Sequence, residues 1–175
     1  MRNVQFLALI AIFVVAACNS KTDSSTTTDF GNVEKTTTSP FTDTVNLDTF
    51  KVALKGTKSK GNALIFRIIS FKGSQIYQTQ INTDELIKDN VKLKTESDKM
   101  KFLSDKVKYF FEDEHFLWPA VMPDELADQH VPDKEFHNEL KQSQLNGFNY
   151  HTGTESKLYI AWSEKDKKVK VYYKL

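Results

Sequence analysis

Cysteine is almost missing from this sequence, and its single example, Cys18, has no partner for an internal disulfide. An excess of one charge is missing too, because 24 Lys and Arg residues nearly balance 23 Asp and Glu residues. This balance argues against a nucleic-acid partner and against strong attraction to anionic lipid. There is no Gly-x-Ser-x-Gly nucleophile motif, and residues 56–62 (GTKSKGN) lack the spacing of a phosphate-binding loop. We therefore expect no cofactor.

A long hydrophobic run is also absent. Met1-Arg2-Asn3 is followed by a mostly apolar segment from Val4 to Ala17. The segment is about 14 residues long, whereas a helix that crosses the bilayer core needs roughly 20. A positive start, a short apolar segment and small residues before a junction are typical of a secretory signal peptide, which we assign to residues 1–17.

The junction reads Val15-Ala16-Ala17-Cys18. A branched aliphatic residue, two small residues and a cysteine resemble the lipobox of bacterial lipoproteins. The resemblance covers only the start of the chain. It implies that lipid is attached to the Cys18 thiol, that the chain is cleaved before Cys18, and that the new amino group is acylated. The protein would then be held at a membrane of the bacterial envelope, with the outer membrane favoured. The alternative is an ordinary signal peptide with an Ala-x-Ala-like cleavage site and an incidental cysteine.

Composition divides the rest of the chain into two parts. Residues 18–44 are rich in Ser, Thr and Asp and contain few large apolar side chains, so we predict a lipid-anchored flexible tether. Residues 45–175 have the length of a single domain with one core, and we predict one α+β globular domain there.

Alternating apolar residues and turn signals predict strands at both ends of the domain. Residues 46–56, 62–71 and 74–81 are expected to be strands, with a turn at Lys72-Gly73. Residues 157–162 and 169–175 are expected to form a C-terminal hairpin around a charged turn. This order favours an antiparallel sheet built from N-terminal and C-terminal hairpins.

Between these hairpins the pattern predicts a helical layer. Asn82 is expected to cap a short helix, and a polar helix is predicted for residues 133–144. The clearest helix is predicted for residues 97–112, because apolar side chains recur there at helical spacing. That stripe consists of Met100, Leu103, Val107, Phe110 and Phe111.

The densest cluster of ionisable residues is Glu112-Asp113-Glu114-His115, at the end of this predicted helix. Glu112 and His115 are three residues apart and would share one helix face, which is the spacing of some carboxylate–histidine metal ligands. They are weak candidates, since a second such pair is needed and His130 and His137 have no spacing that is typical of zinc ligands. A charged helix end is the simpler interpretation, so no metal site is predicted.

The segment from Phe116 to Glu125 (FLWPAVMPDE) crowds apolar side chains around two prolines. One interpretation is an apolar loop in which Trp118 grips a partner; the favoured one is that Trp118 fills the core. The tyrosines of the C-terminal half raise a similar choice between a binding face and ordinary packing on a sheet, and we favour packing. These tyrosines are Tyr150, Tyr159, Tyr172 and Tyr173.

The sequence thus favours a non-catalytic module that binds a protein or glycan partner in the envelope, for example an immunity-type inhibitor of a secreted toxin. The candidate partner-binding residues are Glu112, Asp113, Glu114 and Trp118, because an acidic patch would oppose a basic target. The alternative is a metal-dependent or hydrolytic envelope enzyme that uses Glu112, His115 and a partner histidine.

Overall fold

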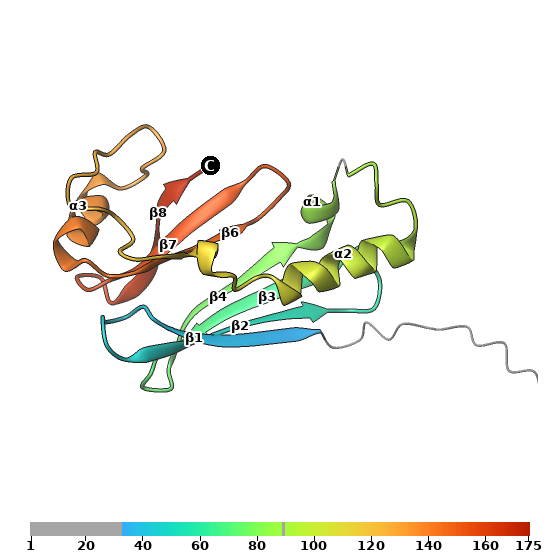
Figure 1. Cartoon of the computed structure of the whole chain (residues 1–175), viewed down its shortest axis with the longest axis horizontal. Helices are drawn as coiled ribbons and strands as arrows, with labels where there is room; N and C mark the ends of the chain where they lie inside the picture. The colour runs from blue at the N-terminus through green and yellow to red at the C-terminus, as the bar shows by residue number, and fades with distance from the viewer. Residues whose placement is uncertain (1–32, 89) are drawn as a thin grey trace, which may run out of the picture.

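The computed structural model describes residues 33–88 and 90–175 (Figure 1). The predicted signal peptide, the lipobox with Cys18 and the first part of the tether lie outside these residues. The described strands form two antiparallel sheets, ordered β1-β2-β3-β4 and β5-β6-β7-β8. The predicted α+β class, with antiparallel hairpins at both ends, is confirmed. The elements are β1 (Glu34–Pro40), β2 (Leu47–Lys55), β3 (Ala63–Ile69), β4 (Gln75–Asn82), α1 (Thr83–Ile87), α2 (Glu96–Lys108), the 3-10 helix η1 (Asp113–His115), β5 (Phe116–Leu117), α3 (Lys134–Ser143), β6 (Gly147–His151), β7 (Lys157–Ser163) and β8 (Lys168–Lys174).

The first strand lies where we predicted a flexible tether. β1 pairs with β2 over its whole length, from Glu34 opposite Ala53 to Pro40 opposite Leu47. The prediction that the tether extends to residue 44 is therefore wrong for residues 34–44. The three threonines of β1 are β-branched and suit a strand. They give no hydrophobic signal, which is why composition alone suggested a tether.

Asp48 fixes the segment that follows β1. Its carboxylate is fully buried and accepts hydrogen bonds from the backbone N–H groups of Phe41 (3.2 Å), Thr42 (2.6 Å) and Phe71 (2.8 Å). The Thr42 hydroxyl contacts the same carboxylate at 2.9 Å. Phe41 lies between β1 and β2, and Phe71 lies between β3 and β4. The Asp48 side chain therefore holds two loops of the first sheet in place.

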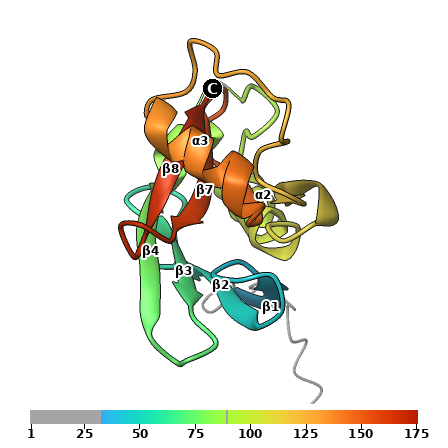
Figure 2. The same ribbon diagram turned by 90° about the vertical axis from the view of Figure 1, so that its left-hand side faces the viewer.

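In the second sheet, side chains alternate between two faces, as the pleat of a strand requires. Phe148, Tyr150 and Ile160 face the first sheet and belong to the main core. Ala161 and Tyr172 lie on the opposite face and pack against α3, which covers β7 and β8 in Figure 2. The second sheet is therefore buried on both faces.

The tyrosines do not share one face of this sheet. Tyr150 and Tyr172 are both buried, at 2% and 3% exposure, on opposite faces. A bulge in the ladder places Tyr173 opposite Tyr159 and leaves Tyr172 as the extra residue of β8. The rings of Tyr172 and Tyr173 lie 6.1 Å and 5.3 Å from that of Tyr159. The interpretation of these four tyrosines as one binding face is wrong.

The helices begin close to the predicted positions. Asn82 caps α1 by accepting a hydrogen bond from the N–H of Asp84. Thr95 and Asp98 form a reciprocal capping box at the start of α2. Asp133 caps α3, which occupies the predicted polar helix.

α2 ends at Lys108, before the predicted end at residue 112. The rings of Phe110 and Phe111 both contact Phe66 and Phe148, with centroids 5.2–6.0 Å apart. Neighbouring side chains on an α-helix point about 100° apart. The helix therefore ends where two successive phenylalanines have to enter the same core.

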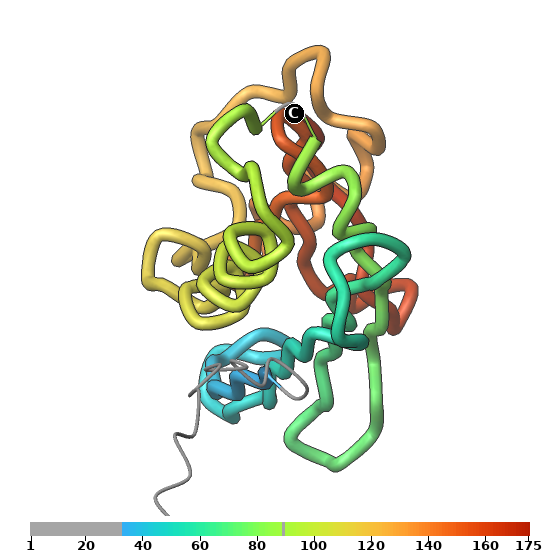
Figure 3. Tube along the Cα trace, turned by 90° about the vertical axis from the view of Figure 1, so that its right-hand side faces the viewer, coloured from blue at the N-terminus to red at the C-terminus, as the bar shows by residue number. Residues whose placement is uncertain are grey.

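One face of the first sheet is covered by two different elements. α2 contacts β1 and β2, whereas β8 of the second sheet contacts β4, and Figure 3 shows this division from one end. The central rings of Phe50, Phe66 and Phe148 join the two sheets and are all fully buried. Where α2 and the second sheet diverge, the surface between them is hollowed. No helix in residues 33–88 and 90–175 is long and apolar enough to cross a membrane.

Candidate functional site

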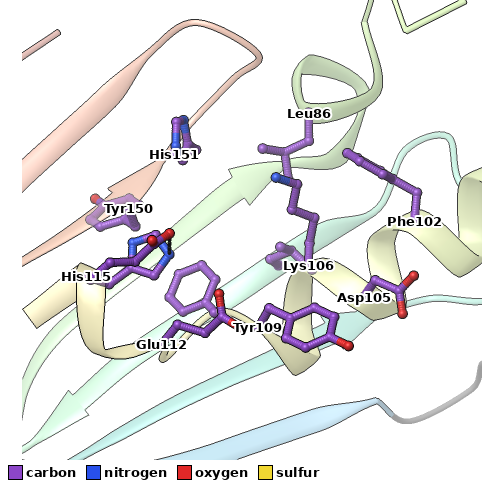
Figure 4. A pocket seen from close by; sticks show the side chains of 12 residues that line it. Leu86, Phe102, Asp105, Lys106, Tyr109, Glu112, His115, Tyr150 and His151 are labelled. Atoms are coloured by element: carbon purple, nitrogen blue, oxygen red, sulfur yellow. Dashed lines mark ion pairs between the residues drawn. The ribbon is translucent and has the colours of Figure 1, made fainter.

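A half-open cleft of about 250 Å³ lies between α2, η1 and β6. Its base is β3, and α1 closes one end (Figure 4). Elements from both halves of the chain thus contribute to a single hollow. The lining residues are Leu64, Leu86, Phe102, Asp105, Lys106, Tyr109, Phe110, Glu112, Glu114, His115, Tyr150 and His151.

The base of the cleft is apolar and aromatic. Leu64 and Leu86 are buried, and the Phe110 and Tyr150 rings lie 6.3 Å apart. The Tyr150 hydroxyl is hydrogen-bonded to the Tyr77 hydroxyl of β4 at 2.6 Å. Burial raises the pKa of Tyr150 far above its ordinary value. Tyr150 therefore contributes an uncharged ring to the cleft, and its hydroxyl is already hydrogen-bonded to Tyr77.

His115 is held in one orientation by Asn149, which is 2% exposed. Its Nδ1 lies 2.9 Å from the Asn149 Oδ1, and the Asn149 amide donates to the Glu114 carbonyl at 3.3 Å. A carbonyl oxygen only accepts, so Nδ1 carries the hydrogen and Nε2 of the neutral ring keeps its lone pair. That nitrogen lies 3.8 Å from the Glu114 carboxylate. The neutral form of His115 therefore brings a hydrogen-bond acceptor to the cleft.

His151 stands opposite, at the end of β6, and is half-buried. Burial lowers the pKa of its imidazole, and Lys106 and Lys157 add to this effect. Both causes disfavour the charged form. His151 is therefore neutral at neutral pH.

The rim of the cleft carries more acidic than basic groups. Asp105, Glu112 and Glu114 line it, against the single ammonium of Lys106. The Lys106 Nζ lies 5.3 Å from the centroid of the Phe102 ring. Figure 4 shows Lys106 extending toward Leu86 and Glu112 lying near His115. The Glu114 carboxylate is 3.8 Å from the same imidazole, so two acidic groups gather around His115.

Family models, characterised proteins and solved structures were compared with this chain, and none matches. A function can therefore be inferred only from the geometry of the cleft and from the sequence before the domain.

The structure brings together most of the acidic cluster that we singled out. Glu112, Glu114 and His115 all line the cleft. Asp113 is exposed in the same 3-10 turn but does not line it. Because α2 ends at Lys108, Glu112 and His115 do not share an α-helix face, and that part of the prediction is wrong.

Trp118 does not fill the core, contrary to our favoured interpretation. It is 59% exposed, and its ring lies beside that of Phe116 at 6.4 Å. The smaller Ala120 and Val121 enter the core instead, where the N–H of Ala120 donates to the Leu145 carbonyl. Trp118 does not line the cleft.

Sequence reasoning missed Lys106, Asn149 and His151 as site residues, and it weighed Tyr150 as part of a binding face but favoured packing. Residues 147–151 (GFNYH) were not predicted to be a strand, although their large side chains alternate with smaller ones. That alternation was the available signal. Across the described parts of the chain, no three His, Cys, Asp or Glu side chains are arranged to hold a metal ion.

Proposed function

We propose that this protein is a lipid-anchored protein of the bacterial envelope whose domain binds a partner without catalysis, as a binding module or an immunity-type inhibitor. The observation that carries the proposal is the cleft between α2 and β6, with its aromatic base and acidic rim. Its volume of about 250 Å³ is below the roughly 300–1,000 Å³ of sites for drug-sized ligands. We therefore expect it to receive one protruding group of a larger partner.

The anchoring part of the proposal rests on Val15-Ala16-Ala17-Cys18. The tether is shorter than predicted, because the domain already begins at β1. About 15 residues separate Cys18 from Glu34, and at roughly 3.5 Å per residue they span at most about 50 Å. The partner is therefore expected close to the membrane surface, with the outer membrane favoured.

The test uses a variant that fills the cleft with a larger side chain and leaves Asn149 and Tyr77, which hold His115 and Tyr150, unchanged. His151→Trp places a large ring in the cleft from its half-buried wall, and Gln80→Trp places the same ring at an exposed position of β4, outside the cleft, as a control. Each full-length variant is used to capture partners from a solubilised envelope extract. We expect the wild type and the control to retain the same dominant partner and His151→Trp to lose it. Equal capture by all three proteins, with unchanged melting temperatures, would contradict the proposal.

A second candidate function has one observation in its favour. The hydrogen bond from His115 to Asn149 orients the imidazole as a general base would need, with Nε2 facing Glu114. A hydrolytic or metal-dependent envelope enzyme would use this pair together with Glu112. Elemental analysis of protein purified without chelator, and melting temperatures with added Zn²⁺ or Mn²⁺, test the metal-dependent form. Substoichiometric metal, together with an unchanged melting temperature, would contradict the hypothesis of a metal-dependent enzyme.

A further inference from the structure

Acceptors dominate the lining of the cleft, although Lys106, the Tyr109 hydroxyl and the His151 imidazole can donate. The carboxylates of Asp105, Glu112 and Glu114 accept hydrogen bonds only. His115 adds an imidazole nitrogen whose lone pair is fixed by the buried Asn149. The fixed imidazole distinguishes the cleft from a surface that is merely acidic. Its orientation is set by a buried hydrogen bond and not by charge.

The two acceptors nearest each other have an unusual spacing. The His115 Nε2 and the Glu114 Oε1 lie 3.8 Å apart, and neither donates when the ring is neutral. A nitrogen with two hydrogens can lie about 2.9 Å from both atoms and bridge them. A group that carries several such N–H donors on a flat frame would also lie against the half-buried ring of Phe110 at the base.

We infer that the cleft binds a guanidinium group, the side chain of an arginine on a protein partner, between the Glu114–His115 acceptor pair and the aromatic base. This inference rests on the proposed binding function and names the chemistry of the group that enters. A guanidinium carries five N–H donors in a planar fork and stacks flat on aromatic faces, whereas an ammonium is a compact charge with three donors and no plane to stack. The excess of carboxylates near Glu112 balances the guanidinium charge.

Lys106 has an aromatic contact of its own. Its Nζ lies 5.3 Å from the centroid of the Phe102 ring, and Figure 4 shows the side chain pointing toward Leu86, whereas Glu112 and His115 lie near each other. The guanidinium therefore enters on the side of Glu112 and His115, which Figure 4 shows apart from Asp105. Glu114 belongs to this side, because its carboxylate lies 3.8 Å from the His115 Nε2.

The direct test compares two probes of the same shape. Nα-acetyl-arginine N-methylamide carries the guanidinium, and Nα-acetyl-citrulline N-methylamide replaces it with a neutral urea. Each is titrated into the full-length protein in detergent micelles, labelled with ¹⁵N-histidine and followed by NMR. We expect the arginine probe to shift the Nε2 resonance of His115 and to bind at least about tenfold more tightly than the citrulline probe, because its hydrogen bonds are charge-assisted.

Two variants distinguish a specific effect of the Glu114–His115 pair from the effect of removing any one negative charge. Glu114→Gln removes the charge of one acceptor, and Glu164→Gln removes an equal charge outside the cleft, where Glu164 pairs with Lys167. Glu114→Gln should lower the affinity for the arginine probe about tenfold and leave the citrulline probe unchanged. Glu164→Gln should change neither affinity. Both side chains are exposed enough for the variants to fold, which circular dichroism checks.

Several outcomes would overturn the inference. Equal binding of both probes, tighter binding of the matching lysine amide, or binding of N-acetylglucosamine alone would each assign the cleft to another chemistry. If neither probe binds while His151→Trp still abolishes partner capture, the guanidinium inference fails and the proposed function stands. If the arginine probe shifts His115 but His151→Trp captures the partner normally, the chemistry stands and the proposed function fails.

Discussion

Replacing Asp48 by alanine should destabilise the domain more than any comparable change on its surface. The carboxylate is fully buried and accepts from three backbone N–H groups and one hydroxyl, in two separate connections of the first sheet. Alanine leaves these donors without an acceptor, and a buried unpaired donor costs about 1–3 kcal/mol. Since the donors can relax toward one another or toward water, we expect a total loss of about 3–5 kcal/mol.

Asp43 provides the matched control in the same connection. Its carboxylate also accepts three hydrogen bonds, from the N–H groups of Val45 and Asn46 and from the Asn46 amide, but these groups are exposed. Asp43→Ala should cost no more than about 1 kcal/mol, since water replaces the lost acceptor.

The assay is equilibrium unfolding of the full-length chain, in urea and by heat, followed by circular dichroism. At about 2–4 °C per kcal/mol for a chain of this size, Asp48→Ala should lower the melting temperature by about 6–20 °C. The control should lower it by less than about 4 °C. Equal losses in the two variants would refute the reasoning, because they would mean that burial of the Asp48 carboxylate does not set the cost.

Three further outcomes are expected. Cys18→Ser should abolish both the incorporation of a fatty-acid analogue and the partition of the protein into detergent, while the domain stays folded. If the wild-type protein is not labelled, the proposed lipid anchor is wrong. Trp118→Ala should cost less than about 1.5 kcal/mol, against about 3–5 kcal/mol for Phe148→Ala, because only Phe148 is fully buried; equal costs in urea unfolding would place Trp118 in the core after all. Because burial lowers the pKa of His151, its unfolded form binds a proton more readily. The stability of the wild type should therefore fall relative to His151→Gln as the pH drops below about 6.5, and parallel pH profiles of the two proteins would contradict this.

The elements that could be predicted are those whose own side chains carry a hydrophobic period. Met100, Leu103 and Val107 recur at helical spacing and are all buried on α2. The C-terminal hairpin alternates between two faces, and β7 and β8 follow it. In both cases the local pattern and the tertiary packing agree.

The remaining features depend on partners distant in sequence. β1 is polar and becomes a strand because β2 offers it a paired edge and Asp48 holds the chain that follows. The end of α2 is set by Phe66 and Phe148, which both Phe110 and Phe111 contact.

The cleft was only half predictable for the same reason. Glu112, Glu114 and His115 are neighbours in sequence and were singled out as a cluster. Lys106 and His151 join them only because α2 and β6 lie on either side of the hollow. The hydrogen bond between His115 and Asn149 links residues 34 positions apart, and no spacing rule indicates it.

The position of β1 has a consequence for copies of the protein that the proposed anchor would hold on one membrane. Among the described strands, β1 is the outer strand of its sheet, so one of its edges has no partner strand within residues 33–88 and 90–175. Confinement to a surface raises local concentration, and an unprotected edge strand would then recruit the same strand of another copy. The strand begins with Glu34 and Lys35 and ends with Pro40, which has no N–H to offer. The polar composition that hid this strand in the sequence therefore protects it against self-association, and replacing Lys35 and Thr37 by valine should make copies of the protein cluster.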